Sequence, residues 1–175
     1  MVLSFFQSFG LPATILRPFN TYGPRQSARA VIPAIIIQIL EGKKKIQLGS
    51  LHPTRDLVFI EDTVNAFIQT LSATSIDGEV IHFGTGQEIS IERLAKMIAE
   101  ILNVKIEIHS CSDRVRPPSS EVERLVADAS KAEKILKWVP KYKGLDGMKK
   151  GLTETVAWFM KKENLEMYKA KLYNV

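Results

Sequence analysis

A short apolar run that ends in a turn-rich polar loop constrains this fold more than any other stretch. Ala13–Leu16 has the composition of a β-strand, and residues 17–25 (RPFNTYGPR) follow it with two prolines, a glycine and two arginines. Open α/β sheets bind their ligands in loops of this kind, beyond the carboxyl ends of the strands. The stretch therefore predicts a ligand-binding loop at the edge of an α/β sheet.

Helical and strand patterns alternate along the chain. The clearest helix follows the N-cap Ser90, because apolar residues recur at offsets 0, 3, 4, 7, 10 and 11 from Ile91. Residues 2–9 have the apolar spacing of a helix end, which Gly10 stops. Further helices are expected over 30–40, after the capping pair Glu61-Asp62 with an apolar face of Val64, Phe67, Ile68 and Leu71, over 128–136, and along Leu145, Met148, Leu152, Val156 and Phe159. Strands are expected over 45–48, 55–60, 79–83, 105–108 and 125–127.

Composition narrows the class of protein. The apolar share of 45% and the charged share of 25% are typical of a globular domain. No apolar run approaches the ~20 residues that span a bilayer, so no membrane partner is expected. A single cysteine, Cys111, excludes an internal disulfide framework and favours a reducing cytoplasm. The histidines and this cysteine show no metal-ligand spacing, so no metal site is expected.

The formal charge of +5 indicates solvated helix faces rather than a nucleic-acid surface. No nucleic-acid motif and no interleaved aromatic residues accompany the lysines. Arginines recur inside loops instead of along one stripe. A small polyanion such as a pyrophosphate therefore fits the charge pattern better.

Motifs that would identify a complete catalytic site are absent from the sequence. There is no G-x-G-x-x-G or G-x-x-G-x-x-G after a strand, and no Walker loop. Residues 84–86 (GTG) form a lone G-x-G, which favours a tight turn over a phosphate cradle. No Ser/His/Asp set has supporting context.

Five short motifs in a fixed order are together more informative. They are RPFNTYGP at 17–24, TRDLVFIED at 54–62, FGTG at 83–86, RP at 116–117, and DASKA with W-x-P over 128–140. The series resembles the C-terminal half of the extended short-chain dehydrogenases/reductases, the NAD-dependent nucleotide-sugar epimerases and dehydratases. The resemblance runs from Leu11 to Phe159. Lys137 departs from it, because the family has glycine at this helix end.

Details at residues 25–33, 49–56 and 120–124 are similar to one subgroup of that family. It comprises the bacterial UDP-N-acetylglucosamine 4,6-dehydratases of the legionaminic-acid type. The family fold implies the C-terminal part of a Rossmann-type parallel sheet interleaved with a small α/β substrate-binding lobe. Residues 1–25 would be the last helix and strand of the Rossmann domain. Residues 26–175 would form the lobe, with 56–86 returning to the sheet.

The resemblance implies a binding role for several loop residues. Arg55 and Arg116 would clamp a pyrophosphate, because guanidinium groups bind phosphate oxygens bidentately. The alternatives are an ion pair of Arg55 with Asp56 and an exposed loop position for Arg116. Asn20 would contact the phosphate or the sugar, or would otherwise hold its loop in an Asx-turn.

Further roles come from the same resemblance. Pro18 and Phe19 would lie near the nicotinamide of NAD, or would simply pack at the strand end. Asp62 is expected to cap a helix rather than to catalyse. Arg29, Ala30 and Val31 would open a helix over the nucleotide, and Glu121 and Arg124 would reach the substrate or pair with each other.

The expected function is the substrate-binding portion of an NAD-dependent 4,6-dehydratase that acts on a UDP-sugar. The family's nucleotide fingerprint, its catalytic Ser/Thr and its Tyr-x-x-x-Lys would all lie upstream of Met1. No catalytic residue is therefore expected in this chain, which would be inactive alone. It would self-associate, for example as a homodimer, repack its N-terminal strand, or be unstable by itself. The alternatives are a UDP-sugar 4-epimerase, a non-catalytic nucleotide-sugar-binding or oligomerisation module, and an RNA-binding surface.

Overall fold

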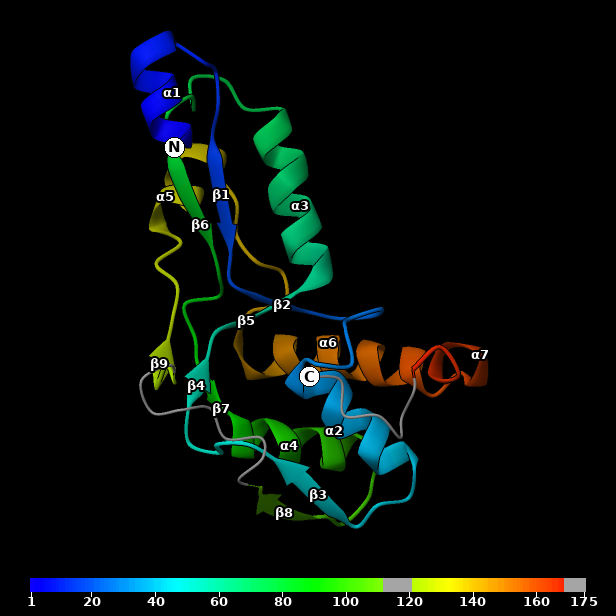
Figure 1. The fold of residues 1–175 in the computed structure, drawn as a ribbon. Coiled ribbons are helices and arrows are strands. Elements are labelled where there is room, and N and C mark those ends of the chain that lie inside the picture. The colour runs from blue at the N-terminus through cyan, green and yellow to red at the C-terminus, as the bar shows by residue number, and fades with distance from the viewer. Residues whose placement is uncertain (112–120, 169–175) are drawn as a thin grey trace.

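A computed structural model describes residues 1–111 and 121–168 and divides them into an upper and a lower region (Figure 1). The upper region contains α1 (Val2–Phe9), β1 (Ile15–Pro18), α3 (Ile60–Leu71), β6 (Val80–Phe83) and α5 (Ser130–Leu136). The lower region contains α2 (Val31–Leu40), β3 (Lys45–Leu48), α4 (Ile91–Ile101), β8 (Glu107–Ser110), α6 (Gly144–Phe159) and α7 (Lys162–Leu165). Short strands lie between the regions: β2 (Asn20–Tyr22), β4 (Thr54–Arg55), β5 (Leu57–Phe59), β7 (Ile89–Ser90) and β9 (Arg124–Leu125).

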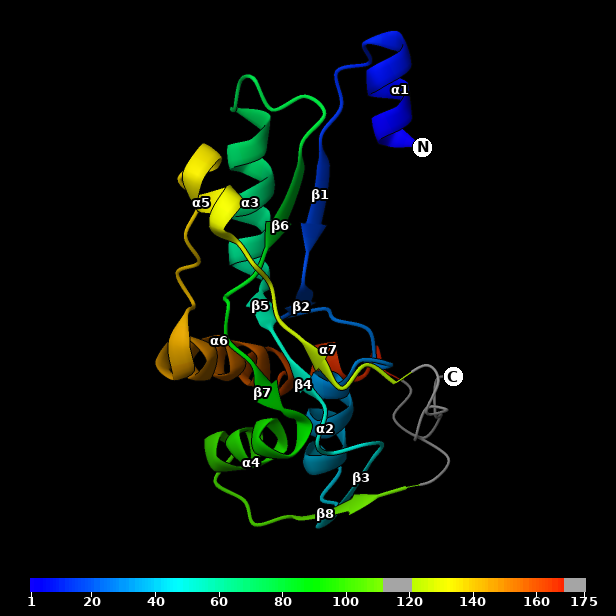
Figure 2. The ribbon, with the colours of Figure 1, turned by 90° about the vertical axis from the view of Figure 1, so that its left-hand side faces the viewer.

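The upper region is built on a pair of parallel strands. β1 pairs with β6 in the register Ile15↔Val80 to Pro18↔Phe83, and Figure 2 shows α3 running alongside them. A small cluster of Ala66, Ile81, Phe83, Ala132 and Trp138 joins α3, β6 and α5. The Phe83 and Trp138 rings meet edge to face, with centroids 5.1 Å apart. The parallel pairing confirms the expected α/β class.

The predicted apolar face of α3 is exposed. Val64, Phe67 and Ile68 are each about half exposed, and Leu71 is 87% exposed. The buried residues of this helix are instead Asp62, Thr63 and Ala66. The helical period located the helix correctly. It could not tell which chain segment would cover the apolar stripe, and no described residue does.

The expected cap of α3 is wrong. The N-cap position is Phe59, and neither Glu61 nor Asp62 caps the helix with a side-chain hydrogen bond. The buried carboxylate of Asp62 instead accepts bonds from the backbone N–H groups of Lys141 (2.8 Å) and Tyr142 (2.9 Å). Asp62 therefore fixes a distant loop rather than its own helix.

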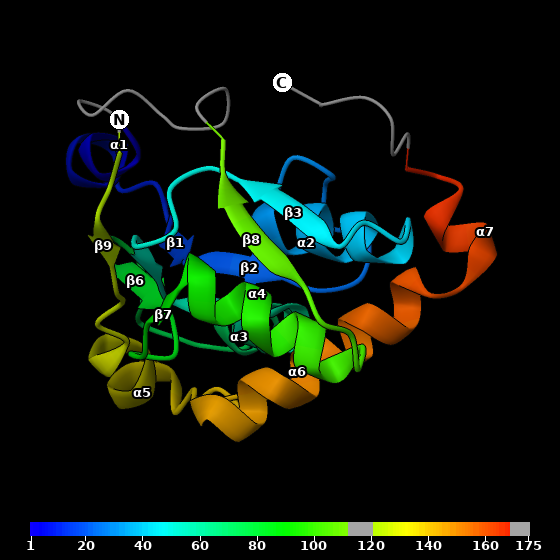
Figure 3. The same ribbon diagram turned by 90° about the horizontal axis from the view of Figure 1, so that it is seen from below.

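The lower region holds the larger core. α2 is buried almost all round, as its isoleucine run predicted, and it packs with α4 and α6. α4 begins at Ser90, whose hydroxyl accepts a bond from the N–H of Arg93, and Leu94 and Ile98 are fully buried. α6 buries Met148, Leu152, Val156 and Phe159, whereas Leu145 remains exposed. Figure 3, which views the molecule from below, shows β3 and β8 lying side by side, and they pair in parallel.

The expected strand boundaries needed small corrections. The strand expected at 13–16 runs from Ile15 to Pro18, and the one expected at 105–108 runs from Glu107 to Ser110. The strand expected at 55–60 is two short strands, β4 and β5, separated by Asp56. β4 pairs with β7 and β9, whereas β5 pairs with β2, because the chain changes sheets at this residue.

Lys137 adopts the left-handed backbone conformation (φ 56°) that the family's glycine would favour, at the end of α5. The predicted division at residue 25, with a return over 56–86, stays a prediction. The small upper cluster adds α5 and Trp138 to the segments that pack there. Among the described helices, none is long and apolar enough to cross a membrane.

Candidate functional site

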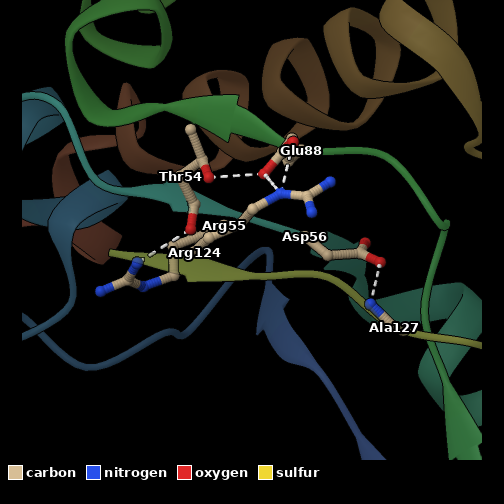
Figure 4. Close-up of polar contacts among 6 residues, drawn as sticks. All are labelled: Thr54, Arg55, Asp56, Glu88, Arg124 and Ala127. Carbon is tan, nitrogen blue, oxygen red and sulfur yellow. Dashed lines mark hydrogen bonds and ion pairs between the residues drawn. The ribbon is translucent and has the colours of Figure 1, made fainter. Parts of the chain in front are cut away.

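Asp56 lies at the junction of the two regions and is completely buried. Its Oδ1 accepts bonds from the N–H (2.9 Å) and the hydroxyl (2.6 Å) of Thr85. Its Oδ2 accepts bonds from the N–H groups of Gly86 (2.9 Å) and Ala127 (3.1 Å), the second of which is drawn in Figure 4. A buried carboxylate requires such partners. Asp56 therefore holds three separate segments of the chain together.

These bonds explain the lone G-x-G at residues 84–86. The N–H groups of Thr85 and Gly86 already donate to Asp56, so they do not form a phosphate cradle. A Cβ on Gly84 would lie 2.1 Å from the Ala127 Cβ and 2.8 Å from the Asp56 Oδ2, a space that only glycine leaves open. The motif is a turn and not a phosphate cradle, as predicted, and it encloses the Asp56 carboxylate.

Arg55 pairs with Glu121. The Arg55 Nη2 lies 3.0 Å from the Glu121 Oε1, and only 16% and 13% of the two side chains are exposed. The Arg55 Nη1 also donates to the carbonyl of Thr54 at 2.8 Å. The alternative of an Arg55–Asp56 pair is wrong. Successive strand residues point to opposite faces, and the Asp56 carboxylate is occupied by other donors.

Arg124 belongs to a different set of contacts. In the β4–β9 ladder, Thr54 is opposite Arg124 and Arg55 is opposite Leu125, so the two arginines lie on opposite faces of the small sheet. Figure 4 shows the Arg124 guanidinium turned toward Glu88, and its Nε lies 2.9 Å from both carboxylate oxygens. Arg124 thus pairs with Glu88 and not with Glu121, contrary to the alternative that the sequence suggested.

The Thr54 hydroxyl completes this set by donating to the Glu88 Oε2 at 2.6 Å. This bond, and then the one from Arg124, hold the pKa of the Glu88 carboxyl below its ordinary value. Glu88, Thr54 and Arg124 come from three adjacent strands or strand ends. Their bonds therefore brace the sheet on the face opposite Arg55.

The segment that follows β1 lies next to Asp56. The Asn20 side chain is exposed, and its Nδ2 donates to the carbonyl of Asp56 at 3.2 Å. This is a contact between strands and not an Asx-turn. Phe19 donates its N–H to the carbonyl of Phe83 at 2.8 Å, and Pro18 ends β1. Asn20 therefore contacts the residue that follows Arg55 in the chain.

Other motif residues have structural contacts or lie elsewhere. Tyr22 is buried, and its hydroxyl donates to the carbonyl of Met148 at 3.3 Å. Burial raises the pKa of this phenol. Arg29 is exposed, Ala30 is the N-cap of α2 and Val31 is its first residue, as expected for a helix opening. Arg116 lies outside the described residues, so its predicted role stays a prediction.

The structural roles of Asp56, Thr85 and Glu88 were not predicted from the sequence. The signal for Asp56 was its position directly after Arg55 in the R-D pair, where only an ion pair was considered. Glu88 carried no motif signal. Among the described residues, no group of three His, Cys, Asp or Glu side chains is arranged to hold a metal ion.

Comparisons with known proteins identify relatives of similar sequence. An uncharacterized UDP-glucose epimerase of Bacillus subtilis, YtcB, is 32% identical over 152 residues, which are 87% of this chain and 46% of that protein. Human dTDP-D-glucose 4,6-dehydratase is 31% identical over 174 residues, 96% of this chain and 47% of that protein. The chain thus spans about half the length of these relatives.

A solved structure extends the comparison to the fold. The UDP-glucuronic acid 4-epimerase of Bacillus cereus, in complex with UDP-glucuronic acid and NAD, superposes with a TM-score of 0.80 at 27% identity. The superposition covers 94% of this chain and 49% of that one. A sequence model described as GDP-mannose 4,6 dehydratase matches residues 1–151. The chain therefore belongs to this family of NAD-dependent nucleotide-sugar dehydratases and epimerases.

Proposed function

We propose that this chain forms the nucleotide-sugar-binding part of an NAD-dependent 4,6-dehydratase that acts on a UDP-sugar. The proposal rests on the position of the Arg55 guanidinium, which is mostly buried. The next residue in the chain, Asp56, accepts a hydrogen bond from the Asn20 side chain through its carbonyl. In this structure Glu121 is the anionic partner of that guanidinium, and the planar fork of an arginine also matches the oxygens of a diphosphate. A UDP-sugar supplies that diphosphate.

We assign the binding roles that the resemblance to the family implies. Arg55 binds the diphosphate and Asn20 contacts the phosphate or the sugar. Arg116 is the second clamp in the proposal, and Glu121, which pairs with Arg55, lies next to the proposed diphosphate position. The helix opening at Arg29, Ala30 and Val31 covers the nucleotide, which suits its backbone N–H groups.

Arg124 has a different assignment. Its ion pair with Glu88 lies on the sheet face opposite Arg55, so it supports the sheet that carries the site. The predicted contact of Arg124 with the substrate stays a prediction. Because Arg55 and Arg124 lie on opposite faces of the sheet, their positive charges are not side by side.

The described residues fit NAD only at the end of β1. Pro18 and Phe19 can face a nicotinamide there, but the Phe19 N–H is already bonded to Phe83. The G-x-G turn holds the Asp56 carboxylate and no phosphate. When bound, NAD would accept a hydride from the sugar and return it. This chain's own part is to hold and orient the nucleotide-sugar beside that group.

We expect no turnover from the chain alone, since its sequence contains neither Tyr-x-x-x-Lys nor a dinucleotide fingerprint. Incubation of the purified chain with NAD and UDP-N-acetylglucosamine tests this expectation. Formation of a 4-keto-6-deoxy product would contradict it.

A 4-epimerase is the second candidate reaction, because the relatives include proteins named as epimerases as well as dehydratases. The two reactions use the same class of substrate and are consistent with the same binding residues. Product analysis of a protein that unites this chain with a complete NAD-binding domain separates them. An epimerase releases a UDP-sugar inverted at C4, whereas a dehydratase removes water from the sugar and releases a 4-keto-6-deoxy product.

Calorimetric titration with UDP tests the binding proposal directly. Arg55→Ala should weaken UDP binding about 30-fold or more, because truncating a buried charge partner costs about 2 kcal/mol or more. Arg93→Ala is the matched control, since it removes the same charge from an exposed pair on α4. Equal affinity of both variants for UDP, or no UDP binding by the unmodified chain, would contradict the proposal and favour a non-catalytic role.

A further inference from the structure

The partner of Arg55 is itself an anion supplied by this chain. The Glu121 carboxylate meets the guanidinium through one oxygen and one nitrogen, 3.0 Å apart. A diphosphate would approach the same guanidinium, and two anions that share one partly buried cation repel each other. Ligand binding at Arg55 therefore competes with the internal pair.

The surroundings of Glu121 favour exchange of its side chain over movement of the strand. The carbonyl of Glu123 accepts the N–H of Thr54 at 2.8 Å, and the carbonyl of Leu125 accepts the N–H of Asp56 at 2.9 Å. These bonds hold the strand two and four residues beyond Glu121. Rotation of the Glu121 side chain would release Arg55 without movement of this strand.

We propose that Glu121 is an internal competitor that occupies the anion-binding position of Arg55 until a diphosphate displaces it. The inference rests on the proposed function, because it assumes that Arg55 binds the diphosphate. The displacing ligand has to bind Arg55 more strongly than Glu121 does, and the Arg55–Glu121 pair joins only one oxygen to one nitrogen. A diphosphate does so, because it carries more charge and can engage the guanidinium bidentately. Glu121 thereby favours diphosphates over singly charged anions.

The direction in which UDP affinity changes when the Glu121 charge is removed tests the proposal. Glu121→Gln keeps the shape and removes the competing charge, so UDP should bind about tenfold more tightly in calorimetry. Glu123→Gln is the matched control, because it makes the same charge change two residues away, at an exposed residue paired with His52. Its effect on UDP affinity should be less than about twofold.

A second pair of variants tests the route through Arg55. In the Arg55→Ala background, Glu121→Gln should no longer tighten UDP binding, since the competition has no common partner. Glu121→Asp should also tighten binding, because the shorter side chain reaches Arg55 poorly. This variant gives the same test if the glutamine variant does not fold.

The outcomes separate the two proposals. If UDP binds the unmodified chain and Arg55→Ala weakens it, but Glu121→Gln binds no more tightly than Glu123→Gln, the competitor role is overturned and the binding role stands. If Glu121→Gln weakens UDP binding, Glu121 contacts the ligand and does not compete with it. If UDP binds neither the unmodified chain nor the variants, both proposals fail.

Discussion

The upper and lower regions of this molecule bury their apolar residues to very different extents. In the lower region Ile35, Leu94 and Leu152 have no exposed surface. In the upper region Phe9 is 77% exposed and Leu71 is 87% exposed, although both lie in regular helices. The lower region therefore has a closed core of its own. The upper region presents apolar helix faces that the described chain does not cover.

This difference shows where the stability of the chain resides. Burial of apolar surface is the main favourable term in folding, at about 25 cal/mol per Å². The lower core has the larger share of that burial, because it contains many more buried apolar residues than the small upper cluster. Trp138 lies in the upper cluster and Trp158 packs against the lower core. Variants that keep only one tryptophan therefore report on each region separately.

The largest expected effect is at the junction. Asp56→Ala should lower the free energy of unfolding by about 4 kcal/mol, because it leaves several buried donors without their acceptor. Trp138 fluorescence should then change at a lower urea concentration than Trp158 fluorescence. Coincident transitions with unchanged midpoints would show that Asp56 does not connect the regions.

The next effect tests the two regions directly. Leu152→Ala should lower the free energy of unfolding by about 3 kcal/mol, as expected when a fully buried leucine leaves a cavity. Leu71→Ala should change it by less than about 0.5 kcal/mol, because this residue is exposed. Urea titration of both variants measures the difference. A large cost at Leu71 would mean that its face is covered in solution, for example by self-association.

A smaller gain is expected at the end of α5. Lys137→Gly should raise the free energy of unfolding by about 1 kcal/mol, because glycine adopts a positive φ without strain. Lys137→Ala is the control: it also removes the Lys137 Nζ bond to the Lys134 carbonyl but retains the strained backbone. The gain should be seen in the Trp138 transition. Equal stability of the two variants would argue against strain at this position.

The smallest effect is a dependence on pH at the small central sheet. The pKa of Glu88 is lower in the folded state than its ordinary value of 4.5, so its contribution to stability is complete above that pH. The contribution is lost as the pH falls through the lowered value. Thermal melts below pH 4.5 should therefore show a steeper loss for the unmodified chain than for Glu88→Gln. Parallel curves would mean that the Thr54 and Arg124 contacts do not persist in solution.

Much of the fold follows from patterns that are local in the sequence. The helical period after Ser90 and the helix over residues 30–40 were each predicted and confirmed. These features depend on backbone hydrogen bonds and side-chain spacing within a few residues. The ordered motifs also identified the family, which the match over residues 1–151 confirms.

Only the tertiary structure decided which side chains meet. Sequence patterns allowed Arg55 to pair with Asp56 and Glu121 to pair with Arg124 as alternatives to substrate contacts, and neither pair is formed. Strand register and the alternation of side chains place Arg55 and Arg124 on opposite faces, where Glu121 and Glu88 are their respective partners. Likewise, Asp62 binds backbone groups at Lys141 and Tyr142. Such contacts join residues far apart in the chain, so they depend on how sheets and loops pack and not on local spacing.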